Sequence, residues 1–473
     1  MSDKKRHITI VGGGITGLAA AFYLQKEIEA KGLPIRFLLL EEKDRLGGKI
    51  QTWRHEGFVI EQGPDSFLER KTSAAQLAAD LGLEQDLVRN STGQAYIWHK
   101  ERLMPIPEGA VMGVPTKLMP FVTTKLISWP GKLRAAADLI LPATVGDGDI
   151  SVGDFFRRRL GDEVIENLIQ PLLSGVYSGD IDNLSLLASF PQFAQMEKQH
   201  RSLILAMKHS RPQAKGQGKP KGIFLTLKNG LESLVEGIES RLPAEAVRKN
   251  TGVQELRKQE NGSYTLVTKD GERIETDAVL FTIPHAAAEP LLRPYAAVPS
   301  LPSAKPHMVA TISLAFPETA VDLRLEGTGF IVPRNSGAKI TACTWAHRKW
   351  PHTTPAGKAL LRCFVGKAKE QSFMQMTDEE IVEMALHDLH KTMTIRQKPD
   401  FYRVTRLQNA IPYVVGHQAW VQDVSAKVAD SLPGVLLAGA SYSGVGVPDC
   451  IDQGKKAVPN LLASVQKAAK QER

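Results

Sequence analysis

The sequence predicts an α/β protein built on a Rossmann-like dinucleotide-binding domain, and three observations support this prediction. An apolar strand, 7–11, runs into a glycine-rich turn and then into an apolar helix. A second strand, 37–40, ends on the acidic residue Glu41. Much later, the run 278–282 is almost continuously apolar, as expected of a strand buried on both faces of a parallel sheet. A further strand is expected at 434–439, so segments far apart in the sequence should share one domain.

The glycine-rich turn has the spacing of a dinucleotide-binding loop. Gly12 permits a tight turn, Gly14 lets the backbone approach a pyrophosphate, and Gly17 allows the helix to pack closely on the strand. The positive end of the helix dipole then faces the phosphates. Glu41 comes 24 residues after Gly17, where an acidic side chain can accept hydrogen bonds from an adenosine ribose. The alternative is a structural glycine turn, which the flanking strand, helix and acid disfavour.

A second glycine pair distinguishes between cofactors. Residues 45–49 read Arg-Leu-Gly-Gly-Lys, directly after the acidic residue. A nicotinamide dehydrogenase needs nothing special here, whereas flavoenzymes use such a segment to bring more backbone and an arginine to the extended FAD. The sequence therefore predicts FAD rather than NAD, with a plain surface turn as the alternative.

The composition limits the number of domains and the classes of binding partner. The chain has 473 residues, enough for two or three domains, and a net charge of +8. This charge is compatible with an acidic small molecule, nucleic acid or a membrane surface. Nucleic acid is disfavoured because the chain has no run of five basic residues and no zinc-binding spacing. We expect no metal site.

The cysteines and the apolar segments indicate the cellular compartment. Three cysteines without a Cys-x-x-Cys pair indicate free thiols in a reducing compartment. The charged N-terminus lacks the apolar core of a signal peptide, and no apolar stretch approaches the roughly 18 residues of a membrane span. We expect a cytoplasmic protein with no integral membrane segment.

The pattern along the chain predicts three domains. A discontinuous FAD-binding domain comprises 1–72, 222–290 and 405–473, with a mainly helical inserted domain over 73–221 and a β-rich substrate-binding domain over 291–404.

Within the helical part, Ser151 should cap a helix over 152–160. The segment 211–221, rich in Lys, Gly, Gln and Pro, is expected to be a loop. The segment 121–145 is expected to pack in the core, with an amphipathic membrane contact as the alternative.

A carboxy-terminal glycine loop, 438–446, precedes a helix expected to begin near Val447. Its glycines permit close approach to a planar ligand, and Pro448 suits the first turn of a helix. The helix would direct N–H groups at the flavin N1 and O2 atoms, where negative charge gathers on reduction. Asp449 can either contact the cofactor or simply complement the helix dipole, and the loop itself can be a structural crossover.

These motifs together resemble a known family. The chain is similar from end to end to the porphyrinogen oxidases, FAD enzymes related to the amine oxidases, and most similar to the soluble coproporphyrinogen III oxidases of Gram-positive bacteria. The resemblance is carried by the stretches 12–17, 45–49, 63–71, 109–117, 155–159, 171–180, 341–345 and 444–454. It implies an amine-oxidase-type FAD-binding domain with a mixed α+β substrate domain.

The resemblance also implies site residues. Lys71 and Val176 match positions that line the family's substrate cavity, and Arg70 and Arg334 are weaker candidates for binding propionates. Leu407 stands where the family often has Trp, so a stacking contact there is in doubt. The implied cofactor contacts are Gly12, Gly13, Gly14, Ile15, Thr16, Gly17, Glu41, Arg45, Gly48, Lys49, Gly63, Pro64, Asp65, Ser66, Val253, Leu407, Val445, Gly446 and Val447.

The implied reaction is the six-electron oxidation of a porphyrinogen in three rounds, with molecular oxygen reoxidising the flavin and hydrogen peroxide released in haem biosynthesis. The cofactor carries the chemistry, so we assign no residue as the general base. The basic charge favours the tetrapropionate coproporphyrinogen over protoporphyrinogen. The alternatives are another flavin amine oxidase and a non-catalytic FAD-bound scaffold, and transient contact with other haem-synthesis enzymes is possible. The cluster 157–159 of three arginines is expected to be a solvated helix face.

Overall fold

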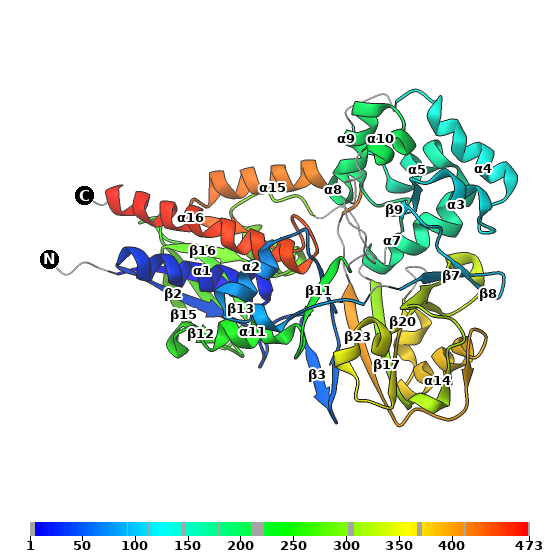
Figure 1. Cartoon of the computed structure of the whole chain (residues 1–473). Helices are drawn as coiled ribbons and strands as arrows, with labels where there is room; N and C mark the ends of the chain where they lie inside the picture. Colours follow the sequence, from blue (N-terminus) through cyan, green and yellow to red (C-terminus); the bar gives the residue numbers. More distant parts are fainter. Residues whose placement is uncertain are drawn as a thin grey trace.

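The computed structural model describes residues 5–91, 93–111, 113–143, 148–177, 180–209, 222–300, 307–366, 371–409 and 413–471. Its first sheet contains five parallel strands and joins segments far apart in the sequence, as predicted (Figure 1). In spatial order they are β12 (Val247–Arg248), β2 (Ile35–Leu40), β1 (Arg6–Val11), β16 (Ala278–Phe281) and β24 (Val435–Leu437).

Helices cover one face of this sheet, and a small antiparallel sheet with two further helices covers the other. Figure 1 shows α1 and α16 side by side. Their backbones approach so closely that a Cβ atom at Gly454 would lie 2.3 Å from the carbonyl oxygen of Thr16. The first layer contains α1 (Ile15–Lys31), α2 (Ser73–Asp80), α11 (Glu232–Glu239) and α16 (Val447–Gln471); the second contains β13 (Val253–Lys258), β14 (Tyr264–Thr268), β15 (Arg273–Thr276), α12 (His285–Leu292) and α15 (His417–Ser431).

A second large sheet has seven strands. Its polar and apolar residues alternate, so one face packs on α14 (Asp378–Leu389) and the other carries hydroxyl and guanidinium groups. In spatial order its strands are β23 (Phe401–Asn409), β17 (His307–Pro317), β21 (Lys358–Val365), β20 (Ile340–Trp345), β19 (Gly329–Ile331), β7 (Ala95–His99) and β8 (Arg102–Pro105). The last two come from the range predicted to be mainly helical, and the division into three domains stays a prediction.

Short strands connect these units. A hairpin pairs β3 (Thr52–His55) with β4 (Phe58–Glu61). The other small sheets are β5 (Phe67–Leu68), β11 (Phe224–Leu227) and β6 (Leu87–Arg89); β9 (Ala110–Val111) and β10 (Val114–Pro115); and β18 (Val321–Asp322) and β22 (Thr394–Ile395).

The helical part forms a separate apolar core. Ser151 accepts a hydrogen bond from the backbone N–H of Asp154 at 2.9 Å, which confirms the predicted N-cap. The predicted loop 211–221 lies outside the described residues. The helices are α3 (Leu118–Thr123), α4 (Trp129–Ala136), α5 (Val152–Leu160), α6 (Asp162–Val164), α7 (Gln170–Tyr177), α8 (Leu186–Ser189), α9 (Pro191–His200) and α10 (Leu203–His209), with α13 (Ala346–Lys349) beside the seven-stranded sheet.

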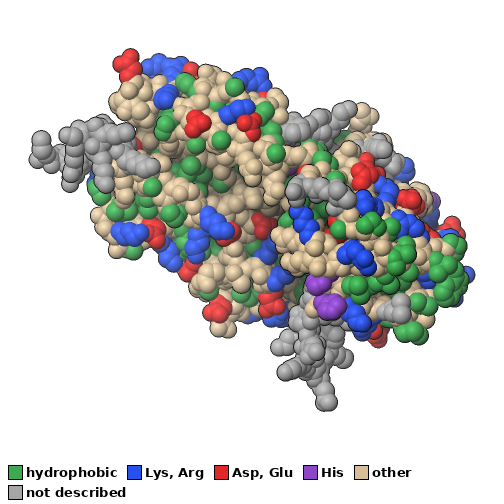
Figure 2. All heavy atoms as spheres, turned by 90° about the horizontal axis from the view of Figure 1, so that it is seen from above, with side chains coloured by type: hydrophobic (Ala, Val, Ile, Leu, Met, Phe, Trp, Pro, Cys, Tyr) green, Lys and Arg blue, Asp and Glu red, His purple; other side chains and the backbone are tan. Residues whose placement is uncertain are grey.

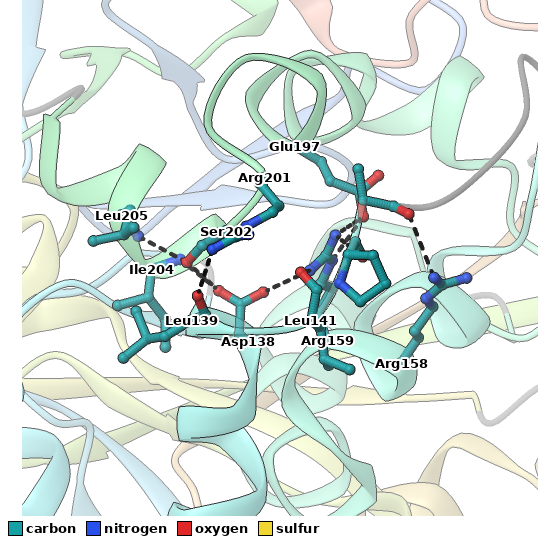
Figure 3. Close-up of polar contacts among 12 residues, drawn as sticks. Asp138, Leu139, Leu141, Arg158, Arg159, Glu197, Arg201, Ser202, Ile204 and Leu205 are labelled. Atoms are coloured by element: carbon teal, nitrogen blue, oxygen red, sulfur yellow. Dashed lines mark hydrogen bonds and ion pairs between the residues drawn. The ribbon is translucent and has the colours of Figure 1, made fainter.

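The prediction of a solvated arginine face on α5 is wrong for Arg159, which is completely buried. Its Nε donates to Glu197 at 2.6 Å and its Nη1 to Asp138 at 3.4 Å (Figure 3). Asp138 also accepts from the Ser202 hydroxyl at 2.7 Å. We call Asp138, Arg159, Glu197 and Ser202 the helical cluster. Three consecutive arginines on a helix point in different directions, so one of them faces the core, where two carboxylates meet it.

The prediction that 121–145 packs in the core is also wrong for much of its described part, 121–143, while residues 144 and 145 lie outside the described residues. Phe121 is buried, but Trp129 is 65% exposed, Leu133 72% and Ile140 77%. Figure 2 shows hydrophobic side chains gathered with lysines and arginines at the end of the molecule formed by the helical part, on the right of the view. The segment is amphipathic, and only one side of it meets the helical core.

The three cysteines are free thiols, as predicted. Cys343 and Cys363 stand opposite each other on β20 and β21, which their sequence spacing did not reveal. Among the described helices, none has both the length and the apolar composition that crossing a bilayer requires.

Candidate cofactor and substrate site

The glycine turn between β1 and α1 has the geometry that its spacing predicts. Gly12 has φ 111°, and a Cβ at Gly17 would lie 2.0 Å from the carbonyl oxygen of Gly12. Both positions therefore require glycine. Around a Cβ built on Gly14, by contrast, no heavy atom of the described chain lies within 4 Å. The turn is thus tight on its inner side and open beside Gly14, where the pyrophosphate is expected.

Glu41 and the second glycine pair close around this turn. Glu41 Oε2 accepts from the backbone N–H of Gly13 at 2.7 Å. The N–H of Gly47 donates to the carbonyl of Gly13 at 2.8 Å, and a Cβ at Gly48 would lie 3.3 Å from Gly14 Cα. The predicted ribose acceptor and both glycine segments therefore meet in one place.

Arg45 shapes the second glycine loop from within. Its Nη1 donates to the carbonyl of Gly48 at 2.9 Å, and its Nη2 donates to the carbonyl of Ile50 at 2.6 Å. A direct contact between Arg45 and the cofactor stays a prediction. Lys49, the next predicted contact, has an exposed side chain.

The segment Gly63–Ser66 is anchored by the buried Arg362 and by the half-buried Asp65 and Lys349. Arg362 donates to the Gly63 carbonyl at 2.6 Å. Asp65 accepts from the Ser66 hydroxyl at 2.6 Å and from Lys349 Nζ at 3.2 Å. Burial alone would raise the pKa of Asp65, but the positive charges of Lys349 and Arg362 outweigh burial, and this pKa is lowered.

Glu61 lies just before this segment and behaves differently. It accepts from the Leu231 N–H at 2.6 Å and from the Thr52 hydroxyl at 2.9 Å. Burial raises the pKa of its carboxyl to about 7, against the lowering effect of these hydrogen bonds and of Arg362. A cavity of about 30 Å³ borders Glu61, Asp65 and Arg362. We call Glu61, Asp65, Lys349 and Arg362 the cofactor-side cluster.

The carboxy-terminal loop meets Lys71. Lys71 Nζ lies 2.6 Å from each carboxylate oxygen of Asp449, which also accepts from the Gly446 N–H at 3.2 Å. Val445 packs against the core of the helical part, and Val447 is buried in the core beneath α1. The predicted propionate partner therefore lies against the loop predicted to face the flavin, held there by the first turn of α16.

The remaining cofactor candidates are distributed along neighbouring elements. Ile15 and Thr16 begin α1, Val253 begins β13, and Pro64 lies inside the anchored segment. Leu407 lies two residues after Thr405 on β23, so it shares the sheet face on which the Thr405 hydroxyl contacts Gln62.

The other substrate candidates have different surroundings. Arg70 is exposed. Arg334 Nη1 pairs with Asp180 at 3.2 Å. Val176 belongs to α7, but its side chain lies outside the described part of the chain.

His417 makes a structural hydrogen bond near the carboxy-terminal loop. It is buried, and its Nε2 lies 3.1 Å from the carbonyl oxygen of Tyr442. The histidine orients the loop that leads to α16.

The residues present fit an FAD molecule. The space beside Gly14 accommodates phosphates near the start of α1, and Glu41 lies at the end of β2. In the carboxy-terminal loop, Gly444 and Gly446 lie close against the side chain of Asp449, where a larger residue would not fit.

Comparison with known proteins identifies the family. Residues 15–462 match the family described as flavin containing amine oxidoreductase. The chain belongs to this family. Membership confirms the predicted fold, the FAD cofactor and the oxidoreductase class.

Several relatives match almost the whole chain. A coproporphyrinogen III oxidase of Bacillus subtilis is 52% identical, over 98% of this chain and 99% of the relative. A coproporphyrinogen III oxidase of Staphylococcus aureus is 43% identical, over 97% and 100%. The crystal structure of a putative protoporphyrinogen oxidase from Exiguobacterium has a TM-score of 0.87 and 39% identity, covering 98% of this chain and 100% of that one.

The sequence did not reveal Glu61, Lys349 or Arg362 as part of the site. Arg362 left one signal, because it is a charged residue in the middle of the apolar run 359–365. Charges in such runs are either paired or functional.

Proposed function

We propose that this protein oxidises coproporphyrinogen III to coproporphyrin III with molecular oxygen. The substrate loses six electrons and six hydrogens, so three oxygen molecules are reduced to three molecules of hydrogen peroxide. The observation that supports this most is the 52% identity, from end to end, with a relative named for this reaction. The site supports it because the cofactor segments and Lys71 converge.

FAD, when bound, accepts electrons two at a time from the substrate and passes them to oxygen. The chain's own part is to bind and orient. Gly12–Gly17 and Gly48 would hold the pyrophosphate, Glu41 the ribose, and Val253 the adenine. The segments Gly63–Ser66 and Val445–Val447 would hold the flavin end, with Leu407 on the neighbouring sheet face.

Lys71 is the first choice for a propionate contact. The ammonium group of Lys71 has three N–H donors. The two carboxylate oxygens of Asp449 fix the position of this group and leave one donor for a ligand. A substrate carboxylate approaching the loop 444–447 would meet an oriented donor at small entropic cost. Arg70, Val176 and Arg334 are the further candidates for the substrate cavity.

A second candidate substrate is protoporphyrinogen IX, because the Exiguobacterium relative is named as a protoporphyrinogen oxidase. Protoporphyrinogen IX has two propionates where coproporphyrinogen III has four, so basic groups in the site contribute less to its binding. With reduced, buried cysteines we also propose a cytoplasmic location, where other haem-synthesis enzymes can make transient contact.

The test is aerobic turnover by the FAD-loaded protein of both porphyrinogens, read by porphyrin fluorescence with peroxide counted. We expect a clear preference for coproporphyrinogen III and about three peroxides per porphyrin, as the electron count demands. Turnover of protoporphyrinogen alone would transfer the assignment to the second substrate. Turnover of neither would overturn the proposed function.

A further inference from the structure

Arg362 stands at the centre of the polar face of the seven-stranded sheet. Across the strands, Arg403, Ser313, Arg362 and Thr344 form one row in register. We propose that Arg362 is a positioning residue for the cofactor, which fixes the peptide of Gly63 and the carboxylate of Asp65 against the flavin and balances the negative charge there. This inference rests on the proposed function only in placing FAD beside Gly63–Ser66.

The contacts are of the kind that fix a peptide. The guanidinium group donates at 2.6 Å to the Gly63 carbonyl, and its Nη1 lies 3.7 Å from Asp65 Oδ2. Lys349 approaches the same carboxylate oxygen from α13, and Ser66 holds the other one. A hydrogen bond from a charged donor to a backbone carbonyl is stronger than a neutral one. The segment is therefore held at two points, the Gly63 carbonyl and the Asp65 carboxylate, by groups from the sheet and from α13.

The anchored peptide is in direct contact with the cofactor loops. A Cβ at Gly63 would lie 1.8 Å from the carbonyl oxygen of Lys49, so the two backbones are packed together. The preceding residue, Gly48, lies against Gly14 in the first glycine turn. A displacement of Gly63 would therefore reach the loop predicted to hold the pyrophosphate.

Stability alone does not account for this arginine. Arg362 is only 5% exposed, and its Nε has no hydrogen-bond partner among the described residues. Burial lowers its pKa, the direction expected for a desolvated cation. Replacing a whole buried ion pair by apolar side chains of similar volume is often neutral or stabilising, so stability does not require charged groups at this place. A buried positive charge is useful where a neighbour takes up negative charge, as a flavin does on reduction.

The experiment compares midpoint reduction potentials of the bound flavin, measured with indicator dyes on the holoprotein. Arg362→Met removes a positive charge, so we expect a more negative potential and roughly tenfold weaker FAD retention. Asp65→Asn removes a negative charge, so we expect a more positive potential. Arg362→Lys should restore most of the potential. Arg406→Met is the matched control, because Arg406 on the same sheet also bonds one carboxylate, Asp378, and one carbonyl, that of Met376.

The expected shifts in reduction potential have opposite signs in Arg362→Met and Asp65→Asn. A general loosening of the flavin site would shift the potential in the same direction in both variants. Equal potentials in the wild type, Arg362→Met and Asp65→Asn would overturn the inference, as would a shift of the same size in Arg406→Met. If Arg362→Met does not fold, the inference is tested by the sign of the shift in reduction potential in Asp65→Asn and by the reduction potential of Arg362→Lys. The readout needs no substrate, so the inference can hold even if porphyrinogen turnover fails.

Discussion

Arg159 and Arg362 are both buried guanidinium groups, but their surroundings differ. Arg159 lies in the helical part, where Glu197 and Asp138 face it and where backbone carbonyls take its other hydrogens. Among the residues that the structure describes, Arg362 donates to one backbone carbonyl, that of Gly63, and it shares Asp65 with Lys349. The first cluster is complete within itself, whereas the second borders a cavity and the predicted cofactor segment. Completeness indicates a structural role, and incompleteness indicates a functional one.

The sharpest way to break this comparison is to remove Arg159. Arg159→Met leaves two carboxylates buried without their cation, so we expect the free energy of unfolding to fall by about 3–5 kcal/mol. Urea denaturation followed by circular dichroism measures this. Arg158→Met, the exposed neighbour on the same helix, is the control and should change stability little. If the reduction potential of the flavin also moved in Arg159→Met, the separation of the two clusters would be lost.

Glu61 tests the cofactor-side cluster by its pH dependence. Its folded-state pKa is about 7 against an ordinary 4.5, so between these values the unfolded chain releases a proton that the folded chain keeps. Stability from this group is fully present below pH 4.5 and is lost as the pH rises to 7. We expect Glu61→Gln to remove this loss, which amounts to about 3 kcal/mol above pH 7.

The measurement for Glu61 is the denaturant midpoint at a series of pH values from 4 to 8. The exposed Glu260→Gln variant is the control and should follow the wild type. A Glu61→Gln curve parallel to that of the wild type would show that Glu61 ionises normally.

Lys71 extends the comparison to the substrate side. Lys71→Met removes the proposed propionate donor, so we expect the KM for coproporphyrinogen III to rise roughly tenfold, with a smaller change in kcat. Steady-state kinetics at saturating oxygen separates the two constants. Lys71→Arg keeps the charge and should recover part of the affinity. An unchanged KM in both variants would remove Lys71 from the substrate site.

The smallest effect is expected at the helix that carries Arg159. Ser151→Ala removes the N-cap of α5, which costs about 1 kcal/mol, while Ser151→Gly should cost only a few tenths. Thermal unfolding of the holoprotein resolves the difference. Equal losses in the two variants would mean that the Ser151 side chain acts through packing rather than through capping.

The fold on the cofactor side could be predicted because it depends on local patterns. Gly12, Gly17 and Glu41 have roles fixed by backbone sterics and by the periodicity of the adjoining strand and helix. Arg159 and Trp129 could not be placed in this way. Whether an arginine faces solvent or two carboxylates depends on segments that lie far away in the sequence, here Asp138 and Glu197.

The site shows the same division. The glycine segments were predicted from their motifs and Lys71 from the family resemblance, and the structure brings Lys71 to the carboxy-terminal loop through Asp449. Arg362 was missed because its role depends on strand pairing in the seven-stranded sheet, which places it beside Gly63 almost 300 positions away in the sequence.

The close packing of α16 on α1 has a consequence for biosynthesis. β1 and α1 leave the ribosome long before β24 and α16, yet these elements meet across the contact between Gly454 and Thr16. The apolar side of α1 therefore lacks its packing partner until α16 has been synthesised. We expect the nascent protein to need shielding by chaperones during this interval, and the cofactor to bind only after α16 has emerged.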